Sequence, residues 1–230
     1  MNDRKGDWLT TFRGKQAWPL DMRVEDIDVR DVAHHLALQC RFGGAVLNHY
    51  SVGEHLVRSS YVVADLGGDP LAGLGHDMQE YVVIDVPRPL KRNLPGYSEI
   101  EDAAAAVVEQ WLGLAPGACS HPIVKRADEI MRQTEKRDHC APQPAPWTVA
   151  QGLPCEPLRW RLNIWTIPGF VRWVRVSTSA TFRALFEGGP VAAGRVAWDA
   201  LREFKHSGPW PTWLTERRFL ARYEELRGRR

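Results

Sequence analysis

The chain has 230 residues, enough for one large domain or two small ones, and its apolar and charged fractions are those of an ordinary globular protein. Its formal net charge of +2 argues against nucleic acid or an anionic membrane as the main partner. The sequence has no run of about 18 apolar residues and no apolar signal segment at its start, so we expect a cytoplasmic protein with reduced thiols and no membrane contact. Its four cysteines include no C-x-x-C pair, so we expect no zinc ribbon.

The first predicted helices carry apolar residues at the 3.6-residue period. Residues 28–40 form one such stripe, and paired glycines then interrupt the pattern. A second helix is predicted over residues 51–66. Ser51 and Glu54 have the S-x-x-E spacing of a capping box, and a Gly-Gly pair follows the last apolar position.

A third helix should begin at Asp69, a residue type that caps helices, with Pro70 in the first helical position. It is predicted to continue through the stretch GLGHDMQEYVV as one helix. It should stop before Pro87, because a residue that precedes proline avoids the helical conformation.

Two further helices are predicted downstream. In residues 97–113, Ser98 and Glu101 repeat the capping-box spacing, and a glycine closes the segment. Residues 121–138 keep their apolar residues in helical register. These segments together predict a mostly helical core.

The composition changes after residue 138. Residues 141–157 are rich in proline and indicate an extended connection, and seven of the ten tryptophans lie beyond residue 138. Alternating apolar residues over 158–164 favour a short hairpin or an irregular extended segment, whereas residues 196–204 have a helical pattern. A last helix, residues 215–226, should pack back on the core through one apolar face formed by Phe219, Leu220, Tyr223 and Leu226.

An imidazole and three carboxylates gather in the otherwise apolar stretch GLGHDMQEYVVIDVPRPLK. Buried charges cost free energy unless they are paired, hydrogen-bonded or bound to a metal. On a helix, Glu80 would lie on the same side as His76 and Asp77, which can bind one cation together. His55 and Asp128 lie beside the apolar stripes of their own predicted helices and would complete a set of four ligands.

Nitrogen and carboxylate donors without thiolate suit one divalent transition metal, Mn, Co, Zn, Fe or Ni, rather than calcium. Such an ion lowers the pKa of a bound water, and Glu80 could position that water or transfer a proton. Spacing alone leaves the alternative open, since a histidine beside an apolar stripe is more often a hydrogen-bonded core residue than a ligand.

The order His55, His76-Asp77 and Asp128 resembles the H…HD…D signature of the HD-domain metal-dependent phosphohydrolases. Four segments that contain or flank these residues resemble, in the same order, segments of that family's bacterial 5′-deoxynucleotidases and phage deoxynucleotide phosphohydrolases; they are CRFGG…HYSVGEH, GHDMQEYVVIDVPRPLK, YSEIEDAAAAVVEQWLG and IVKRADEIMRQTEKRD. The similarity covers about residues 28–138.

The resemblance implies an all-α HD-domain helical bundle over residues 1–140. A Trp/Pro-rich, partly irregular extension would follow over residues 141–230 and end in the helix that packs back on the core. Residues 141–212 are longer and richer in tryptophan than is usual in the family. Two roles are open for them, a lid over the substrate pocket or a contact between copies of the chain in a homo-oligomer.

Site residues follow from the resemblance position by position. The implied metal ligands are His55, His76, Asp77 and Asp128. Glu80 matches the acidic residue that handles the attacking water, and Asp85 matches an aspartate near the substrate sugar and the scissile phosphate. The implied substrate contacts are Arg41, Phe42 and Lys91.

Each of these roles also has a structural alternative. Glu80 could form an ion pair with Arg41, Asp85 could be a turn residue that bonds its own backbone, and Lys91 could be a solvated loop cation. Phe42 stands where the nucleotidases often have tryptophan, so the sequence leaves base and sugar selectivity open.

The implied function is hydrolysis at the 5′ phosphate of a nucleotide or deoxynucleotide. The enzyme would be a 5′-deoxynucleotidase or a deoxynucleotide triphosphohydrolase, with a metal-activated water attacking at the 5′ oxygen. One alternative is an inactive nucleotide-binding sensor with the same fold, which would have no need for Glu80. Another is a nucleic-acid-binding protein that uses the Trp/Arg-rich C-terminal part, against which the low net charge argues.

Overall fold

The computed structural model describes residues 3–145 and 210–229. The chain divides into two compact units, Met1–Arg132 with Trp210–Arg230, and Gln133–Pro209. The hairpin or extended segment predicted over residues 158–164, the helix predicted over residues 196–204 and most of the Trp-rich region lie outside the described residues.

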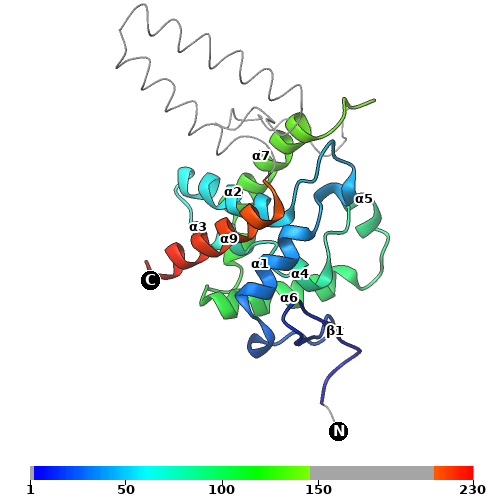
Figure 1. Ribbon diagram of the computed structural model, residues 1–230, viewed down its shortest axis with the longest axis vertical. Coiled ribbons are helices and arrows are strands. Elements are labelled where there is room, and N and C mark those ends of the chain that lie inside the picture. The colour runs from blue at the N-terminus through cyan, green and yellow to red at the C-terminus, as the bar shows by residue number, and fades with distance from the viewer. Residues whose placement is uncertain (1–2, 146–209, 230) are drawn as a thin grey trace, which may run out of the picture. The chain divides into compact units, whose positions relative to one another are not determined.

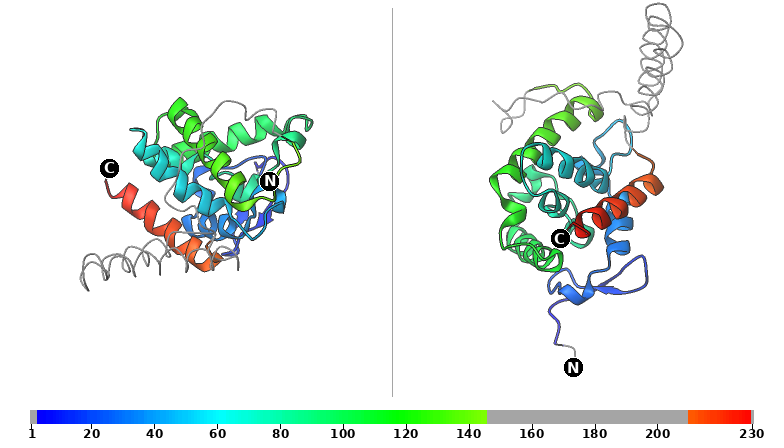
Figure 2. Two further views of the ribbon diagram at one scale, coloured as in Figure 1. Left: turned by 90° about the horizontal axis from the view of Figure 1, so that it is seen from above. Right: turned by 90° about the vertical axis from the view of Figure 1, so that its left-hand side faces the viewer.

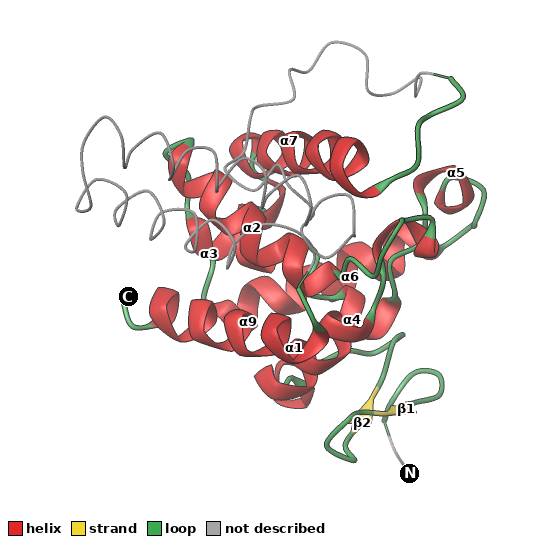
Figure 3. Cartoon of the chain, turned by 45° about the horizontal axis from the view of Figure 1, so that its top comes forward, coloured by secondary structure: helices red, strands yellow, loops and turns green. Residues whose placement is uncertain are grey.

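The described chain is mostly helical, as the sequence predicts (Figure 1). Its α-helices are α1 (Val29–Leu38), α2 (Val52–Asp65), α3 (Pro70–Gly75), α4 (Glu80–Val83), α5 (Arg88–Lys91), α6 (Tyr97–Leu112), α7 (Pro122–His139) and α9 (Thr212–Arg227). Three short 3-10 turns lie at Val24–Asp26, Arg41–Gly44 and Ala118–Ser120. Two strands, β1 (Leu9–Thr10) and β2 (Gln16–Ala17), pair antiparallel near the N-terminus (Figure 3).

Short polar side chains cap the starts of α2 and α3, as predicted. Ser51 Oγ accepts a hydrogen bond of 3.1 Å from the Glu54 amide at the start of α2. Asp69 accepts one of 2.9 Å from the Leu71 amide at the start of α3. Each cap satisfies an amide that the first helical turn leaves without a partner.

The second predicted capping box is wrong. Helix α6 begins at Tyr97, and Gly96 precedes it in the left-handed conformation without a side-chain cap. Ser98 therefore lies inside the helix, and the Glu101 carboxylate forms an ion pair with Lys91 instead of reaching back to the helix start. The predicted glycine stop is confirmed, since Gly113 ends α6 at a φ of 69°.

The single helix predicted through the HDMQE stretch is also wrong. Helix α3 ends at Gly75, and α4 begins only at Glu80. Between them, the Met78 amide donates to the Gly75 carbonyl and the Glu80 amide to the Asp77 carbonyl, each at 3.1 Å. These bonds span three residues instead of four, so the chain winds more tightly and turns the side chains of this stretch to new directions.

Helix α2 is the central helix of the first unit, and most of its residues are buried. It packs against α1, α3 and α9, and α9 also lies along α1 (Figures 1 and 2). The site residue His55 is carried by this helix and is fully buried. Its position is therefore set by packing on several sides rather than by a loop.

Helix α9 joins the other helices of the first unit through polar as well as apolar contacts. The Trp210 amide, just before the helix, donates to Glu54 Oε2 at 2.6 Å, and Arg222 Nε donates to Ser60 Oγ at 3.0 Å. On the predicted apolar face, Phe219 and Leu226 are buried, while Leu220 and Tyr223 are half-buried. None of the described helices has the length and apolar character needed to cross a bilayer.

Candidate metal centre

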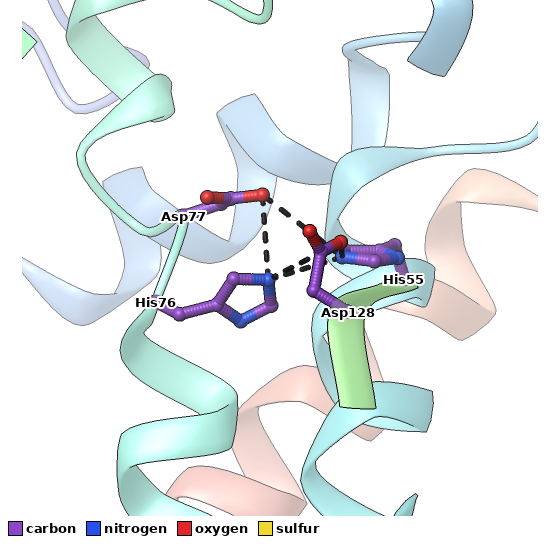
Figure 4. Close-up of side chains that lie close together, drawn as sticks. All are labelled: His55, His76, Asp77 and Asp128. Carbon is purple, nitrogen blue, oxygen red and sulfur yellow. Dashed lines mark hydrogen bonds and ion pairs between the residues drawn. The ribbon is translucent and has the colours of Figure 1, made fainter. Parts of the chain in front are cut away.

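The four predicted ligand residues meet at one point in the structure (Figure 4). His55 comes from α2, His76 and Asp77 follow the end of α3, and Asp128 comes from α7. One donor atom from each lies within 4.8 Å of the others. The sequence places these residues far apart, so only the packing of the helices brings them together.

The distances between donor atoms suit a single ion. His55 Nε2 lies 3.2 Å from His76 Nε2 and 3.4 Å from Asp128 Oδ1, and His76 Nε2 lies 3.4 Å from Asp77 Oδ2. The His55–Asp77 and His76–Asp128 donor atoms are further apart, at 3.9 Å. Ligand atoms about 2.1 Å from one transition metal ion are about 3.0–3.4 Å apart at tetrahedral or octahedral angles. Two imidazoles and two carboxylates also match the donor preference and the charge of a divalent cation.

The ring of His76 is oriented for this role by its other nitrogen. Nδ1 lies 2.8 Å from the Gly73 carbonyl oxygen, which can only accept, so Nδ1 carries the proton. The lone pair of Nε2 then points toward the other three side chains. Such a hydrogen bond from the distal ring nitrogen is the usual support of a metal-binding histidine.

Gly73 also sets the spacing between α3 and α2. A Cβ atom at this position would lie 2.7 Å from Val63 Cγ2, a distance that such contacts essentially never show, and 3.1 Å from Ser60 Cα, which is tighter than most. Glycine therefore permits the close crossing that carries His76 to within hydrogen-bonding distance of His55.

Two arginines flank the carboxylates of the cluster. Arg41 Nη1 lies 3.8 Å from Asp77 Oδ2, and Arg88 Nη2 lies 3.3 Å from Asp128 Oδ2. Burial opposes ionisation of Asp77, but His76, His55 and Arg41 outweigh it and hold the pKa of this carboxyl below its usual value. No motif in the sequence marked Arg88 or its pairing with Asp128.

Glu80 begins α4 and is 5% exposed. Its Oε2 atom is buried and has no hydrogen-bond partner among the described residues. Burial, followed by repulsion from Asp77 and Asp85, raises the pKa of Glu80 well above its usual value, and the attraction of Arg41 does not offset this. A buried carboxyl beside the ligand cluster that readily takes up a proton can act as an acid–base group.

The remaining predicted site residues lie in the 3-10 turn Arg41–Gly44 and in the segment that runs from the end of α4 through α5. Arg41 is buried and its guanidinium lies 5.5 Å from the centroid of the Phe42 ring. Asp85 is half-buried and follows Ile84, the residue after the end of α4. Lys91 forms an ion pair with Glu101, and its ammonium lies 5.6 Å from the centroid of the Tyr97 ring.

Sequence reasoning missed the groups that support these segments. Gln39 Nε2 donates to the Glu80 carbonyl at 2.8 Å and ties α4 to the end of α1. Tyr97 donates its hydroxyl to carbonyls at the end of α4. No local pattern marks either residue, because each acts on a segment distant in the chain.

The chain matches no model of a known protein family. The uncharacterized protein YfdR of Escherichia coli (strain K12) is 37% identical over 147 residues, which cover 64% of this chain and 80% of YfdR. The uncharacterized protein RCAP_rcc00048 of Rhodobacter capsulatus is 35% identical over 142 residues, which cover 57% of this chain and 72% of that protein. At this identity and coverage, the chain belongs to the same protein family as YfdR.

Proposed function

We propose that this protein is a metal-dependent phosphohydrolase of the HD type that acts on deoxynucleotides. The observation that carries the proposal is the convergence of His55, His76, Asp77 and Asp128 beside the buried carboxyl of Glu80. A structural cluster of buried polar groups has no need for a further carboxylate with a buried oxygen that finds no partner among the described residues. The resemblance of the ordered ligand set to the HD phosphohydrolases supplies the reaction class.

The four side chains would hold one divalent ion, with Mn, Co, Zn, Fe and Ni all compatible with these donors. When bound, such an ion lowers the pKa of a water molecule and polarises a phosphoryl oxygen. Asp77 and Asp128 would balance its charge. Arg41 forms an ion pair with Asp77, and Arg88 forms one with Asp128.

The other site residues have complementary roles in this scheme. Glu80 accepts a proton from the attacking water, and its raised pKa makes it a stronger base than an ordinary carboxylate. Arg41, buried beside Asp77, stabilises negative charge on the phosphoryl group. Asp85 holds the deoxyribose or assists the departing 5′ oxygen, while Lys91 adds positive potential near the phosphate.

The proposal is tested with purified protein and a panel of deoxy- and ribonucleoside mono- and triphosphates, each with Mn, Co or Zn. We expect Asp77→Ala to lose both bound metal, measured by elemental analysis, and hydrolysis. Glu80→Gln should keep the metal and lose about 10²–10⁴-fold in turnover, the usual contribution of a general acid–base group.

Asp65→Ala is the matched control, because it removes an exposed carboxylate from α2, the helix that carries His55. It should keep both metal and turnover. Stoichiometric metal in Asp77→Ala would contradict the ligand assignment. Near-normal turnover in Glu80→Gln would contradict the proton-transfer role, and a wild type that binds nucleotides without hydrolysing them would make the protein a sensor.

A further inference from the structure

Two residues beside the candidate site have an unusual backbone. Among the described residues, Phe42 and Ile84 are the non-glycine residues with a positive φ, at 57° and 71°. Phe42 follows Arg41, and Ile84 precedes Asp85. Residues held in such conformations cost about 1–3 kcal/mol each and persist only where their surroundings impose them.

Ile84 is the more strained of the two. Its ψ of 145° places it in a region that is almost restricted to glycine, and its side chain is branched at Cβ. The side chain is 60% exposed, so burial of apolar surface does not hold the residue in this conformation. The constraint must therefore act on the backbone.

The backbone constraint comes from Tyr97, the first residue of α6. Its hydroxyl oxygen lies 2.6 Å from the Ile84 carbonyl oxygen and 2.8 Å from that of Val83, so one donor serves both carbonyls. On the other side, the Ile84 amide donates to the Glu80 carbonyl at 2.9 Å. The amide and the carbonyl of Ile84, the residue that leads into Asp85, are thus both fixed by hydrogen bonds.

The Tyr97 ring is itself held in place. The Lys91 ammonium lies 5.6 Å from its centroid and pairs with Glu101, which is one turn further along α6. Burial, followed by repulsion from Glu101 and Glu80, raises the pKa of Tyr97. The hydroxyl therefore remains a donor at every pH at which the protein would be assayed.

We propose that Tyr97 is a positioning residue of the active site: its hydroxyl locks the strained Ile84 peptide and thereby directs Asp85 toward the deoxyribose and the 5′ oxygen of a deoxynucleotide. The inference rests on the proposed function, in which Asp85 meets that part of the substrate. Tyr97 touches neither substrate nor metal in this scheme and acts only through the conformation of the loop.

The test compares Tyr97→Phe with the wild type. The variant keeps the ring and loses only the hydroxyl, so metal content should be unchanged. Turnover should fall about 10–100-fold, because a misplacement of about 1 Å has an effect of this size. Hydrogen exchange of a peptide spanning residues 83–92 should become faster, since the segment loses its fixed carbonyls.

A double variant separates positioning from a general structural effect. If Tyr97 acts through Asp85, then Asp85→Asn with Tyr97→Phe should be no slower than Asp85→Asn alone. Losses that multiply would overturn the inference. Tyr61→Phe is the matched control: this tyrosine is exposed on α2, and its ring, which faces Arg222, is kept.

The two proposals fail in different ways. If the wild type hydrolyses no nucleotide, the proposed function is wrong, and the exchange measurement still decides whether Tyr97 fixes the loop. Unchanged exchange in Tyr97→Phe would overturn that constraint. Faster exchange with unchanged turnover in an active enzyme would overturn the positioning role.

Discussion

Glu80 combines near-complete burial with a carboxylate oxygen that accepts no hydrogen bond from the described residues. Ionising such a group costs free energy, because neither water nor a donor replaces its lost hydration. A residue chosen for stability alone would be neutral at this position. We infer that Glu80 destabilises the folded protein and is kept for its role in catalysis. Such a trade-off between stability and activity is common at active sites.

This inference predicts a pH-dependent gain of stability in metal-free Glu80→Gln. Burial and acidic neighbours raise the folded-state pKa of Glu80, so wild-type stability declines as pH rises from the unfolded pKa, about 4.3, through the folded value. We compare the unfolding free energy of the variant with that of the wild type at each pH. This difference should favour the variant more at pH 8 than at pH 4, by on the order of 1 kcal/mol.

Urea unfolding at the two pH values measures this difference. Glu224→Gln serves as the control, since Glu224 is an exposed carboxylate on α9. A stability difference between Glu80→Gln and the wild type that is equal at both pH values, or a less stable variant at pH 8, would show that ionised Glu80 does not destabilise the folded state.

At the scale of elements, the crossing of α3 on α2 decides whether a site exists. His76 reaches His55 because Gly73 lets the two helices approach, and the Gly73 carbonyl also orients the His76 ring. The same glycine therefore controls both the distance between two ligands and the direction of one of them.

Gly73→Ala should destabilise the protein by about 1–3 kcal/mol, because the new methyl group meets Val63 and the backbone at Ser60. It should also weaken metal binding by moving His76 away from His55. Unfolding in urea and metal titration in the folded protein measure the two effects separately.

Ala106→Gly provides the comparison. Ala106 is exposed on α6, and glycine in a helix interior costs about 1 kcal/mol. This variant should lose stability and keep the wild-type metal affinity. If Gly73→Ala also keeps that affinity, the helix crossing does not set the ligand distance.

At the scale of the whole molecule, the metal centre joins segments that are distant in the chain. Its ligands lie on α2, after α3 and on α7, all within the first compact unit. Helix α9 joins the same unit from the end of the chain through the Trp210–Glu54 hydrogen bond, next to His55. An ion bound at the centre should therefore stabilise this unit against global unfolding.

Metal at about 100 times its dissociation constant should raise the unfolding free energy of the wild type by about 2.7 kcal/mol. Urea unfolding of the full chain with and without Mn, Co or Zn measures this gain. Asp65→Ala should respond like the wild type, and Asp77→Ala should not respond. Bound metal without any shift of the wild-type midpoint would show that the ion binds the unfolded chain as well.

The sequence by itself determined the class of the fold and the candidate ligands. Ser51 and Asp69 begin helices, and Gly113 ends one, because caps and stops depend on groups within a few residues. The apolar period predicted the long helices for the same local reason. The ordered histidines and aspartates were visible as well, although spacing alone left their convergence undecided.

The tertiary structure alone decided how these parts act together. The helix expected through His76 breaks at Gly75, where a Cβ atom would lie 2.5 Å from Leu112 of α6. Glu101 pairs with Lys91 instead of capping its helix, and Tyr97 holds the strained peptide at Ile84. Each outcome depends on contacts between segments distant in the chain, and a local pattern carries no information about which distant group will be its neighbour.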